Sequence, residues 1–422
     1  MAPIETSLQP PNGEWKRTVL AALSLCLLLC SYYILRPVRD AMAVQIDENQ
    51  RQWLFTGTFI YTLAVVPIFG WMVKRFSRAV LIPVTFGLMI SMLIGFYVLF
   101  SVSDSDRMKL VSYAAFFIWL SMFNVLIVSV FWSAVSDAFS TDQAQRFYGY
   151  ITAGGTAGAI LGPITTLSIS QHTSTPNLLL VSAGILFLAL LMILQLGRLA
   201  ETRERKLHRP LGGSILAGVT QTVRSPVLSQ LAGLVICYST VSTVLYLEMA
   251  NLVGKEIPKA DQTAFFSRID LAVNVLALIV QLLATRFVLN RLGVNWALAV
   301  APAAMLIGLT MFGIQPAILL LAVVQVAHRA SEFALTRPGR EVLFTTVDAE
   351  SRYKAKNFID TAVYRANDSA SAWLITAVRS HHLNVIWVVG VPVTLAWLVL
   401  SRRIGRSRIA ARDPAQETVS AS

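Results

Sequence analysis

The sequence has little charge for its length. Only 14% of its 422 residues are Asp, Glu, Lys or Arg, whereas 55% are hydrophobic. A soluble domain carries charge on about a quarter of its residues, because its whole surface faces water. The composition therefore excludes an ordinary soluble protein and indicates a chain with much of its surface in lipid.

Motifs of catalysis and cofactor binding are absent as well. The sequence contains no GxSxG, HExxH or Walker A motif, and its three cysteines are not grouped with histidines. Cys26, Cys30 and Cys237 lie in apolar runs, where we expect them to be buried small apolar residues. We therefore expect neither an enzyme nor a metal or cofactor site. Without a Walker A motif, this chain alone does not pump at the expense of ATP.

Long apolar segments are what the sequence does contain. A helix that crosses a bilayer needs about 20 mostly apolar residues, and this length predicts about twelve helices in the chain. The expected fold class is an all-α membrane protein. The predicted spans are 17–36, 53–73, 80–101, 110–134, 147–169, 177–197, 227–250, 263–287, 294–312, 316–337, 355–378 and 383–400.

Positive charge is distributed unevenly between these spans. The formal net charge is +12, from 35 Lys and Arg against 23 Asp and Glu. With a cytoplasmic N-terminus, most Lys and Arg fall in cytoplasmic connections, as the positive-inside rule requires. A basic balance can also indicate nucleic-acid binding, but membrane orientation accounts for it here. We expect a multi-pass protein of the cell inner (plasma) membrane, with both termini cytoplasmic and no nucleic-acid partner.

The longest basic connection divides the chain in two. The segments FSTDQAQRFYGY (139–150) and FTTVDAESRYKAK (344–356) follow the fourth and tenth spans and share a pattern. Such a repeat predicts the major-facilitator arrangement, in which two six-helix halves surround a central path. The predicted parts are a cytoplasmic tail (1–16), a six-helix half (17–197), a cytoplasmic linker (198–226), a second six-helix half (227–400) and a cytoplasmic tail (401–422).

Several charged residues fall inside the spans or at their ends, where hydrocarbon makes charge costly. Arginine holds carboxylate and phosphate groups by two parallel hydrogen bonds, which favours an anionic small-molecule substrate. The same charges could instead be ion pairs between helices. The candidates for substrate binding are Arg36, Arg39, Arg268, Arg329 and Arg365, and those for proton coupling or ion pairing are Asp40, Asp270, Glu332, Asp360 and Asp368.

Spacing along the chain ranks these arginines. Arg329 and Arg365 each have an acidic residue three positions later, so ion pairing explains them easily. Arg36 could pair with the carboxylate four positions later, although the proline at 37 disfavours helix there. Arg39 and Arg268 are therefore the first choices for contact with a substrate.

Charges also flank two connections that correspond in the repeat. Asp137 and Arg146 lie between the fourth and fifth spans, and Glu341 and Arg352 lie similarly after the tenth. We interpret them as cytoplasmic gate charges that pair in one state and separate in another. Static bridges between loops are the alternative.

Glycines mark one face of the fifth span. Gly154, Gly155, Gly158 and Gly162 fall on nearly the same side of a helix. Small residues at this spacing let two membrane helices approach closely. We therefore predict a close helix contact along this face.

Three segments carry a family resemblance: YYILRPVRDAM (32–42), VSVFWSAVSDAFSTDQAQRFYGYITAGGTAGAILGP (128–163) and RPGREVLFTTVDAESRYKAKNFIDTAVYRANDSASAW (337–373). They resemble the ATP/ADP translocase family of plastids and intracellular bacteria, and more closely its free-living bacterial relatives. The resemblance implies a nucleotide exchanger of twelve helices. It also implies a role in transport for Arg39, which stands before the Asp that closes the first span.

Together these features predict a secondary transporter that opens a central site alternately to the two sides of the membrane. The expected substrate is an anionic small molecule, with ATP/ADP-type nucleotide exchange as one form. A proton-coupled major-facilitator transporter of another metabolite or drug is the alternative. A non-transporting membrane scaffold or regulator is the alternative of another class. We expect a monomer in the lipid bilayer.

Overall fold

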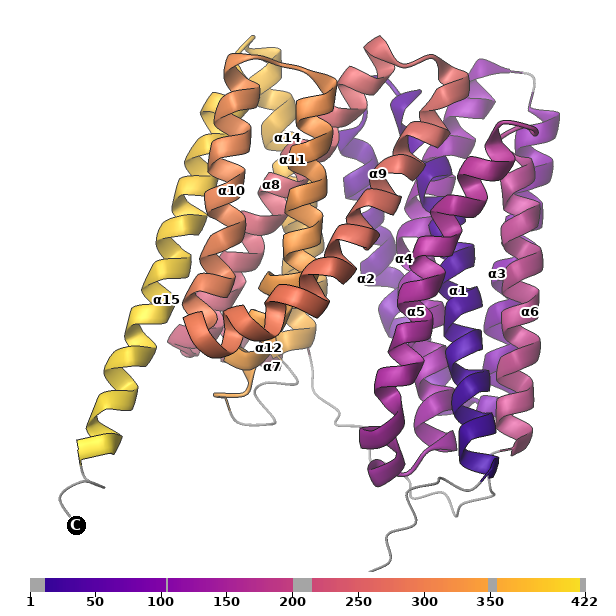
Figure 1. The fold of residues 1–422 in the computed structure, drawn as a ribbon. Helices are drawn as coiled ribbons and strands as arrows, with labels where there is room; N and C mark the ends of the chain where they lie inside the picture. Colours follow the sequence, from indigo (N-terminus) through magenta and orange to yellow (C-terminus); the bar gives the residue numbers. More distant parts are fainter. Residues whose placement is uncertain (1–11, 104, 200–214, 348–354, 418–422) are drawn as a thin grey trace, which may run out of the picture. The chain divides into compact units, whose positions relative to one another are not determined.

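The computed structural model describes residues 12–103, 105–199, 215–347 and 355–417, and nearly all of them are helical (Figure 1). The α-helices are α1 (Asn12–Val44), α2 (Gln52–Arg75), α3 (Arg78–Val102), α4 (Asp106–Ala138), α5 (Thr141–Ser170), α6 (Asn177–Leu199), α7 (Ile215–Arg224), α8 (Pro226–Glu256), α9 (Lys259–Val280), α10 (Val294–Ile314), α11 (Ile318–Ser331), α12 (Arg337–Phe344), α14 (Tyr364–Ser380) and α15 (Val391–Glu417). Within the described residues, π-helical turns are η1 (Gln281–Thr285), η2 (Val288–Leu292), η3 (Glu332–Thr336), η4 (Phe358–Val363) and η5 (Ile386–Gly390).

The helices confirm the all-α membrane fold. Among the described residues, 10 helical segments are long and apolar enough to cross a bilayer. The predicted spans outside this group are the fifth and the eleventh, which correspond to α5 and to η4 with α14. Glycine and threonine make α5 less apolar, and charged residues do the same for α14. Less apolar spans at matching places of two repeats are a pointer to a binding region.

Helix α1 is longer than the sequence predicted. The predicted first span ended at residue 36, but the helix continues through Pro37 to Val44. A proline removes one backbone hydrogen bond, a loss that neighbouring groups compensate in membrane helices. The expectation that Pro37 disfavours helix at Arg36 was therefore wrong. One continuous helix carries Arg36, Arg39 and Asp40.

The chain forms two compact units. Unit 1 comprises Met1–Met42, Ala64–Leu207 and Thr263–Leu271, and unit 2 comprises Ala43–Leu63, His208–Gln262 and Ala272–Ser422. Residues 43–63 thus belong to unit 2 and residues 263–271 to unit 1, and the division into halves at 17–197 and 227–400 stays a prediction.

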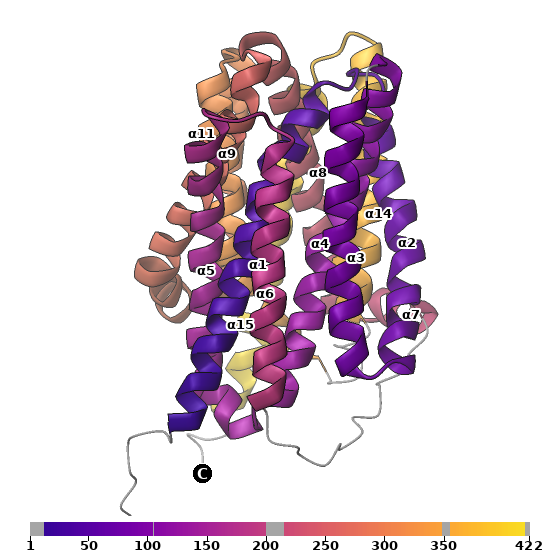
Figure 2. The same cartoon turned by 90° about the vertical axis from the view of Figure 1, so that its right-hand side faces the viewer.

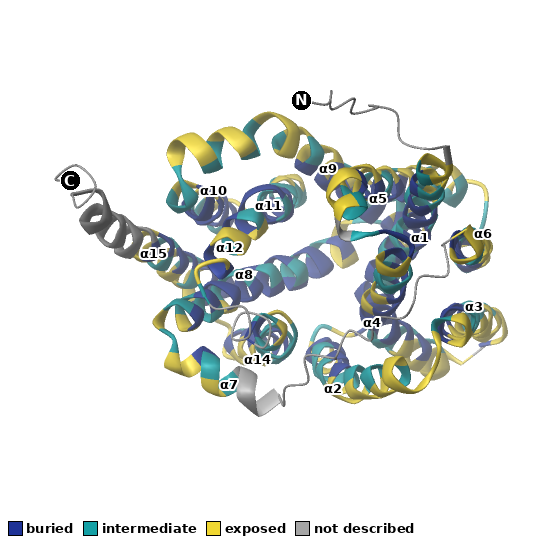
Figure 3. Ribbon diagram, turned by 90° about the horizontal axis from the view of Figure 1, so that it is seen from below, coloured by how far each residue is buried: buried dark blue, intermediate teal, exposed yellow. Residues whose placement is uncertain are grey.

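Each unit has a core between its helices. In unit 1, α3 packs against α4 and α6, and α4 also contacts α6 (Figure 2). In unit 2, α8 packs against α11, α14 and α15, and it is buried over most of its length (Figure 3). Exposed faces carry large apolar side chains such as Leu282 and Leu283, with 73% and 77% exposed. Such faces suit contact with lipid.

Glycines bring α5 against α1 in unit 1, as predicted. A Cβ atom added at Gly154 or Gly158 would come within 3.0 Å of the main-chain carbonyl of Ala22 or Cys26, respectively. One at Gly162 would meet the carbonyl of Cys30 at 2.8 Å. The backbones of the two helices are therefore close enough that only glycine fits between them.

We expect Gly158→Ala to lower the stability of the folded protein by about 1–3 kcal/mol, because the new methyl group overlaps backbone atoms rather than a movable side chain. The measurement is thermal unfolding of the purified protein in detergent. Gly184→Ala on α6 is the matched control, since a Cβ there meets nothing within 4 Å. Equal unfolding temperatures for the two variants would contradict the close contact of α1 with α5.

Candidate functional site

Charged residues of α1 meet α4 and α9 in unit 1. Nη1 of Arg36 lies 3.7 Å from Oδ1 of Asp270 on α9, and the Asp270 side chain is only 2% exposed. Arg39 donates from Nη2 and Nε to Oδ1 of Asp40, at 2.6 and 2.9 Å. Its guanidinium also lies 5.0 Å from the ring centre of Phe117 on α4. Arg36 therefore pairs across to α9, rather than with Asp40 as its spacing suggested, because Arg39 occupies that carboxylate.

Arg268 differs from the other arginines of this region because it is exposed. Its neighbours Ser267 and Ile269 are 0% and 5% exposed, so one face of α9 is buried and Arg268 lies outside it. In the described part of the chain we find no hydrogen bond or ion pair of Arg268. At 1.5 Å per residue it lies about 14 Å along the helix from Lys259, well inside a spanning segment. Charge at that depth favours a face that meets water or a polar solute.

A second charged cluster lies in unit 2, where α11 continues through η3 into α12. Oε1 of Glu332 lies 3.4 Å from Nε of Arg337 and 3.9 Å from Nη2 of Arg340. Arg340 also lies 3.4 Å from Oδ1 of Asp360 in η4. Spacing had suggested Arg329 as the partner of Glu332. In a π-helical turn residue i+5 lies over residue i, which places Arg337 there instead.

Helix α14 contains an ion pair of its own and forms hydrogen bonds to α8. Arg365 and Asp368 lie 3.5 Å apart, in the pair that their spacing suggested. Asp368 also accepts a hydrogen bond from Thr243 of α8 at 3.5 Å. The neighbouring Asn367 donates to Ser239 of α8 at 2.6 Å. These bonds hold α14 to α8, and a role of Arg365 or Asp368 in binding or coupling stays a prediction.

The predicted gate residues have other partners in this structure. Asp137 forms an ion pair with Arg78 at the start of α3, not with Arg146. The guanidinium of Arg146 instead lies 5.4 Å from the ring centre of Phe147. In unit 2, Glu341 pairs with Lys356 at 2.6 Å. The other predicted gate residue, Arg352, lies outside the described residues.

A polar cluster that sequence reasoning missed joins the α1–α2 connection to α8 and α14 in unit 2. Arg379 forms ion pairs of 2.6 Å with both Glu48 and Glu248. Arg51 donates to two main-chain carbonyls in the last turn of α1, to that of Ile46 just after the helix, and to the side chain of Asn251. Asn251 in turn donates to Glu48 at 2.9 Å. We name these five residues the outer cluster, because the positive-inside pattern predicts this end to be extracellular.

Burial shapes the electrostatics of the outer cluster. Arg51 is only 5% exposed, and this burial lowers its pKa from the ordinary value. The carbonyls at the end of α1 offset this effect, since the C-terminal end of a helix favours positive charge. The sequence contained one signal for the cluster: Glu248 falls inside the predicted span 227–250, where a charge needs a partner.

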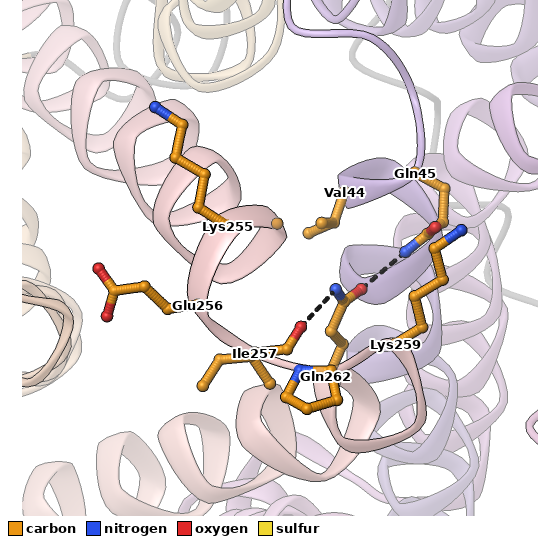
Figure 4. A pocket seen from close by; sticks show the side chains of 9 residues that line it. Val44, Gln45, Lys255, Glu256, Ile257, Lys259 and Gln262 are labelled. Atoms are coloured by element: carbon orange, nitrogen blue, oxygen red, sulfur yellow. Dashed lines mark hydrogen bonds between the residues drawn. The ribbon is translucent and has the colours of Figure 1, made fainter.

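A hollow of about 410 Å³ lies at the same end of α8 (Figure 4). Gln45 donates to Gln262 at 2.8 Å on one side of it, and Gln262 donates to the carbonyl of Ile257 at 3.1 Å. Lys255 and Lys259 lie on opposite sides of the hollow, as Figure 4 shows. Because the charges do not converge, the hollow is a weaker candidate for an anion site than the region of Arg268.

Comparison with known proteins agrees with this architecture. Residues 21–334 match the family model of the Major Facilitator Superfamily. A bacterial homologue of the iron transporter ferroportin, in its inward-facing state, has a TM-score of 0.66 at 13% identity and covers 94% of this chain and 98% of its own. The nucleoside transporter NupG has a TM-score of 0.57 at 13% identity, and the match covers 95% of this chain and 99% of NupG. A bacterial homologue of the human lysosomal transporter Spinster has a TM-score of 0.57 at 11% identity, and the match covers 94% of each chain.

At these identities the likeness to the solved structures is one of fold alone. No curated protein matches the sequence.

Proposed function

Since the chain belongs to the Major Facilitator Superfamily and is a multi-pass secondary transporter that works by alternating access, we propose that its substrate is an anionic small molecule. We infer that arginines of α1 and α9 bind the anionic group. Family membership removes the reason to consider a non-transporting scaffold or an enzyme. What the family leaves open is the solute, because one fold serves many substrates.

The exposure of Arg268 carries this proposal. Arg36, Arg39 and Arg268 place three positive charges on α1 and α9 of unit 1, against the two carboxylates of Asp40 and Asp270. The surplus positive charge favours an anion over a cation or a neutral solute. Arg36 is held loosely at 3.7 Å, so its guanidinium can turn toward a ligand. A planar guanidinium suits a carboxylate or a phosphate group.

Nucleotides are the first substrates to examine, because three segments resemble ATP/ADP translocases. The sequence departs from that family in the fourth span, where WLSMFNVLIVSVFW (119–132) contains no acidic residue. Other organic anions, driven by a proton gradient, are therefore the second group. Glu332, a buried carboxylate with 2% exposed, is the candidate residue for coupling in that alternative.

The test is uptake of labelled ADP and ATP into liposomes that contain the purified protein, with and without nucleotide inside. We expect uptake of an anion that unlabelled organic anions inhibit. Dependence on internal nucleotide supports exchange, whereas dependence on an imposed pH gradient supports proton coupling. Uptake of neutral solutes alone, without inhibition by any anion, contradicts the proposal.

A further inference from the structure

Helix α1 carries an aromatic ring one turn away from the arginines that are proposed to bind the anionic group. Tyr32, Arg36 and Arg39 follow one another at intervals of four and three residues, so they share one side of the helix. All three are partly buried, whereas Ile34 and Leu35 on the opposite side are 0% exposed. At 1.5 Å per residue, Tyr32 lies about 6 Å along the helix from Arg36 and about 10 Å from Arg39.

Neighbouring helices of unit 1 cover the other sides of α1. The glycines of α5 pack on one side, as described above. On another side Ser31 bonds to Ser182 of α6 at 2.8 Å, and both serines are 0% exposed. Phe117 of α4 and Asp270 of α9 flank the side that carries the two arginines. Because charge in contact with hydrocarbon is costly, the exposed part of this side suits water or a polar solute rather than lipid.

Contacts between rings hold Tyr32 in one orientation. Its ring stacks on Phe123 of α4, with ring centres 6.5 Å apart and planes 14° from parallel. The ring of Tyr33 meets it edge-on, with ring centres 5.3 Å apart. Phe123 is 0% exposed and packs in turn against Trp119 at 5.1 Å. Buried rings thus support Tyr32 from one direction, and such support reduces the cost of ordering the ring when a ligand binds.

Packing of the protein interior is the simpler interpretation of Tyr32, but two observations do not fit it. A ring that only fills the core is enclosed, as Phe116 and Phe123 are at 0% exposure, whereas Tyr32 is partly open. A tyrosine hydroxyl in the interior usually finds a hydrogen-bond partner. The hydroxyl group of Tyr32 bonds to none of the described residues and is not enclosed. Tyr32 therefore presents ring surface to the same space as the arginines.

We propose that the transported anion carries a planar aromatic ring, which stacks on Tyr32 while Arg36 and Arg268 hold the anionic group. Stacking requires a flat ring, because two π-systems attract each other in offset parallel or edge-on arrangements. The helix places the ring about 6–10 Å from the carboxylate or phosphate group. This inference rests on the proposed function, since it uses the same arginines, and it narrows the substrate class from anions in general to aromatic anions.

Matched pairs of anions test the requirement for a ring. Phenylbutyrate and cyclohexylbutyrate have the same carboxylate and the same carbon skeleton, but only phenylbutyrate has a flat ring. AMP and ribose phosphate differ by the base. Affinities follow from the rise in unfolding temperature of the purified protein with ligand concentration. We expect the aromatic member to bind about tenfold more tightly, which corresponds to ~1.4 kcal/mol. Equal affinities within both pairs, or no binding of either aromatic anion, would overturn the proposal.

Substitutions at Tyr32 assign the preference to this ring. Tyr32→Leu should weaken the aromatic member about tenfold and abolish the preference, whereas Tyr32→Phe keeps the ring and should retain it. Tyr150→Leu is the matched control, because Tyr150 is 58% exposed and lies beside Trp15, about 25 Å along α1 from Tyr32. A preference that persists in folded Tyr32→Leu would overturn the assignment. If Tyr32→Leu does not fold, the matched pairs and Tyr32→Phe still decide.

The same measurements separate failure of this inference from failure of the proposed function. Arg268→Ala should weaken both members of a pair equally, because both carry the same charge. Equal binding within each pair that Arg268→Ala weakens would overturn the role of Tyr32 and support an anionic substrate. A preference for the ring that neutral phenylbutanol shares, unchanged in Arg268→Ala, would support the ring site at Tyr32 and overturn the anionic substrate.

Discussion

Arg268→Ala is expected to reduce transport strongly while the protein remains folded in the membrane. Its side chain is exposed and forms no hydrogen bond or ion pair with another described residue, so its removal breaks no polar interaction within the described part of the fold. A charge-assisted hydrogen bond to a substrate contributes about 1.5–3 kcal/mol, which corresponds to a loss of about 10- to 150-fold in kcat/KM. The initial rate of uptake into liposomes, compared with the thermal unfolding temperature, separates loss of binding from loss of stability.

Two further variants serve as controls for Arg268→Ala. Arg268→Lys keeps the charge but loses the planar fork, so it should recover only part of the activity. Arg286→Ala removes an exposed arginine farther along the same helical segment and should transport like the unaltered protein. Normal transport by Arg268→Ala would refute the assignment of this residue to the substrate.

Arg379→Ala is expected to loosen the outer cluster. Its removal leaves the carboxylates of Glu48 and Glu248, both previously 2.6 Å from the guanidinium, to repel each other. Side chains here are 19–32% exposed, so solvent screens part of the effect. We expect the free energy that holds the α1–α2 connection against α8 and α14 to fall by about 1–3 kcal/mol. A shift of ~1.4 kcal/mol changes the population of an open state tenfold.

Chemical labelling measures that opening. Ser369 is 9% exposed on α14 and bonds to Thr56 of α2 at 2.9 Å, so a cysteine placed there should react slowly with an impermeant maleimide. In the Arg379→Ala background the labelling rate should rise about tenfold, as the population shift requires. Adding Glu248→Gln should restore slow labelling, since it removes the repulsion. A rate unchanged by Arg379→Ala would show that the outer cluster does not limit opening.

Sequence reasoning succeeded where the signal is local. Glycines at 154, 158 and 162 predicted a close helix contact along one face of α5, because helical spacing alone determines which residues share a face. That α1 is the partner helix is known only from the structure. The pairing of Arg365 with Asp368 followed from a separation of three residues on one helix. Hydropathy and the distribution of positive charge predicted an all-α membrane fold for the same reason, since each span is recognised by its own composition.

Sequence reasoning failed where the partners of an ion pair come from distant segments or where a helix departs from regular α-helical geometry. Glu48, Glu248 and Arg379 are far apart in the sequence, so no spacing rule brings them together. Glu332 was assigned to Arg329 on the assumption of a regular helix, and the π-helical turn changed its partner. Arg268 is a different case: the sequence predicts it as a candidate for substrate binding, a role that stays a prediction, and only the fold shows that it is exposed.

The polar face of α14 has a consequence for how the chain enters the membrane during synthesis. A charge near the centre of a segment opposes insertion by about 2.5–3.5 kcal/mol, and Arg365 and Asp368 both lie in this region. Because Asn367 and Asp368 bond to Ser239 and Thr243 of α8, that helix supplies the polar partners that lipid cannot. Helix α8 precedes α14 in the chain and is therefore synthesised before it. Assembly of unit 2 therefore cannot be completed before α14 has been synthesised, because the bonds between α8 and α14 join segments that are far apart in the chain.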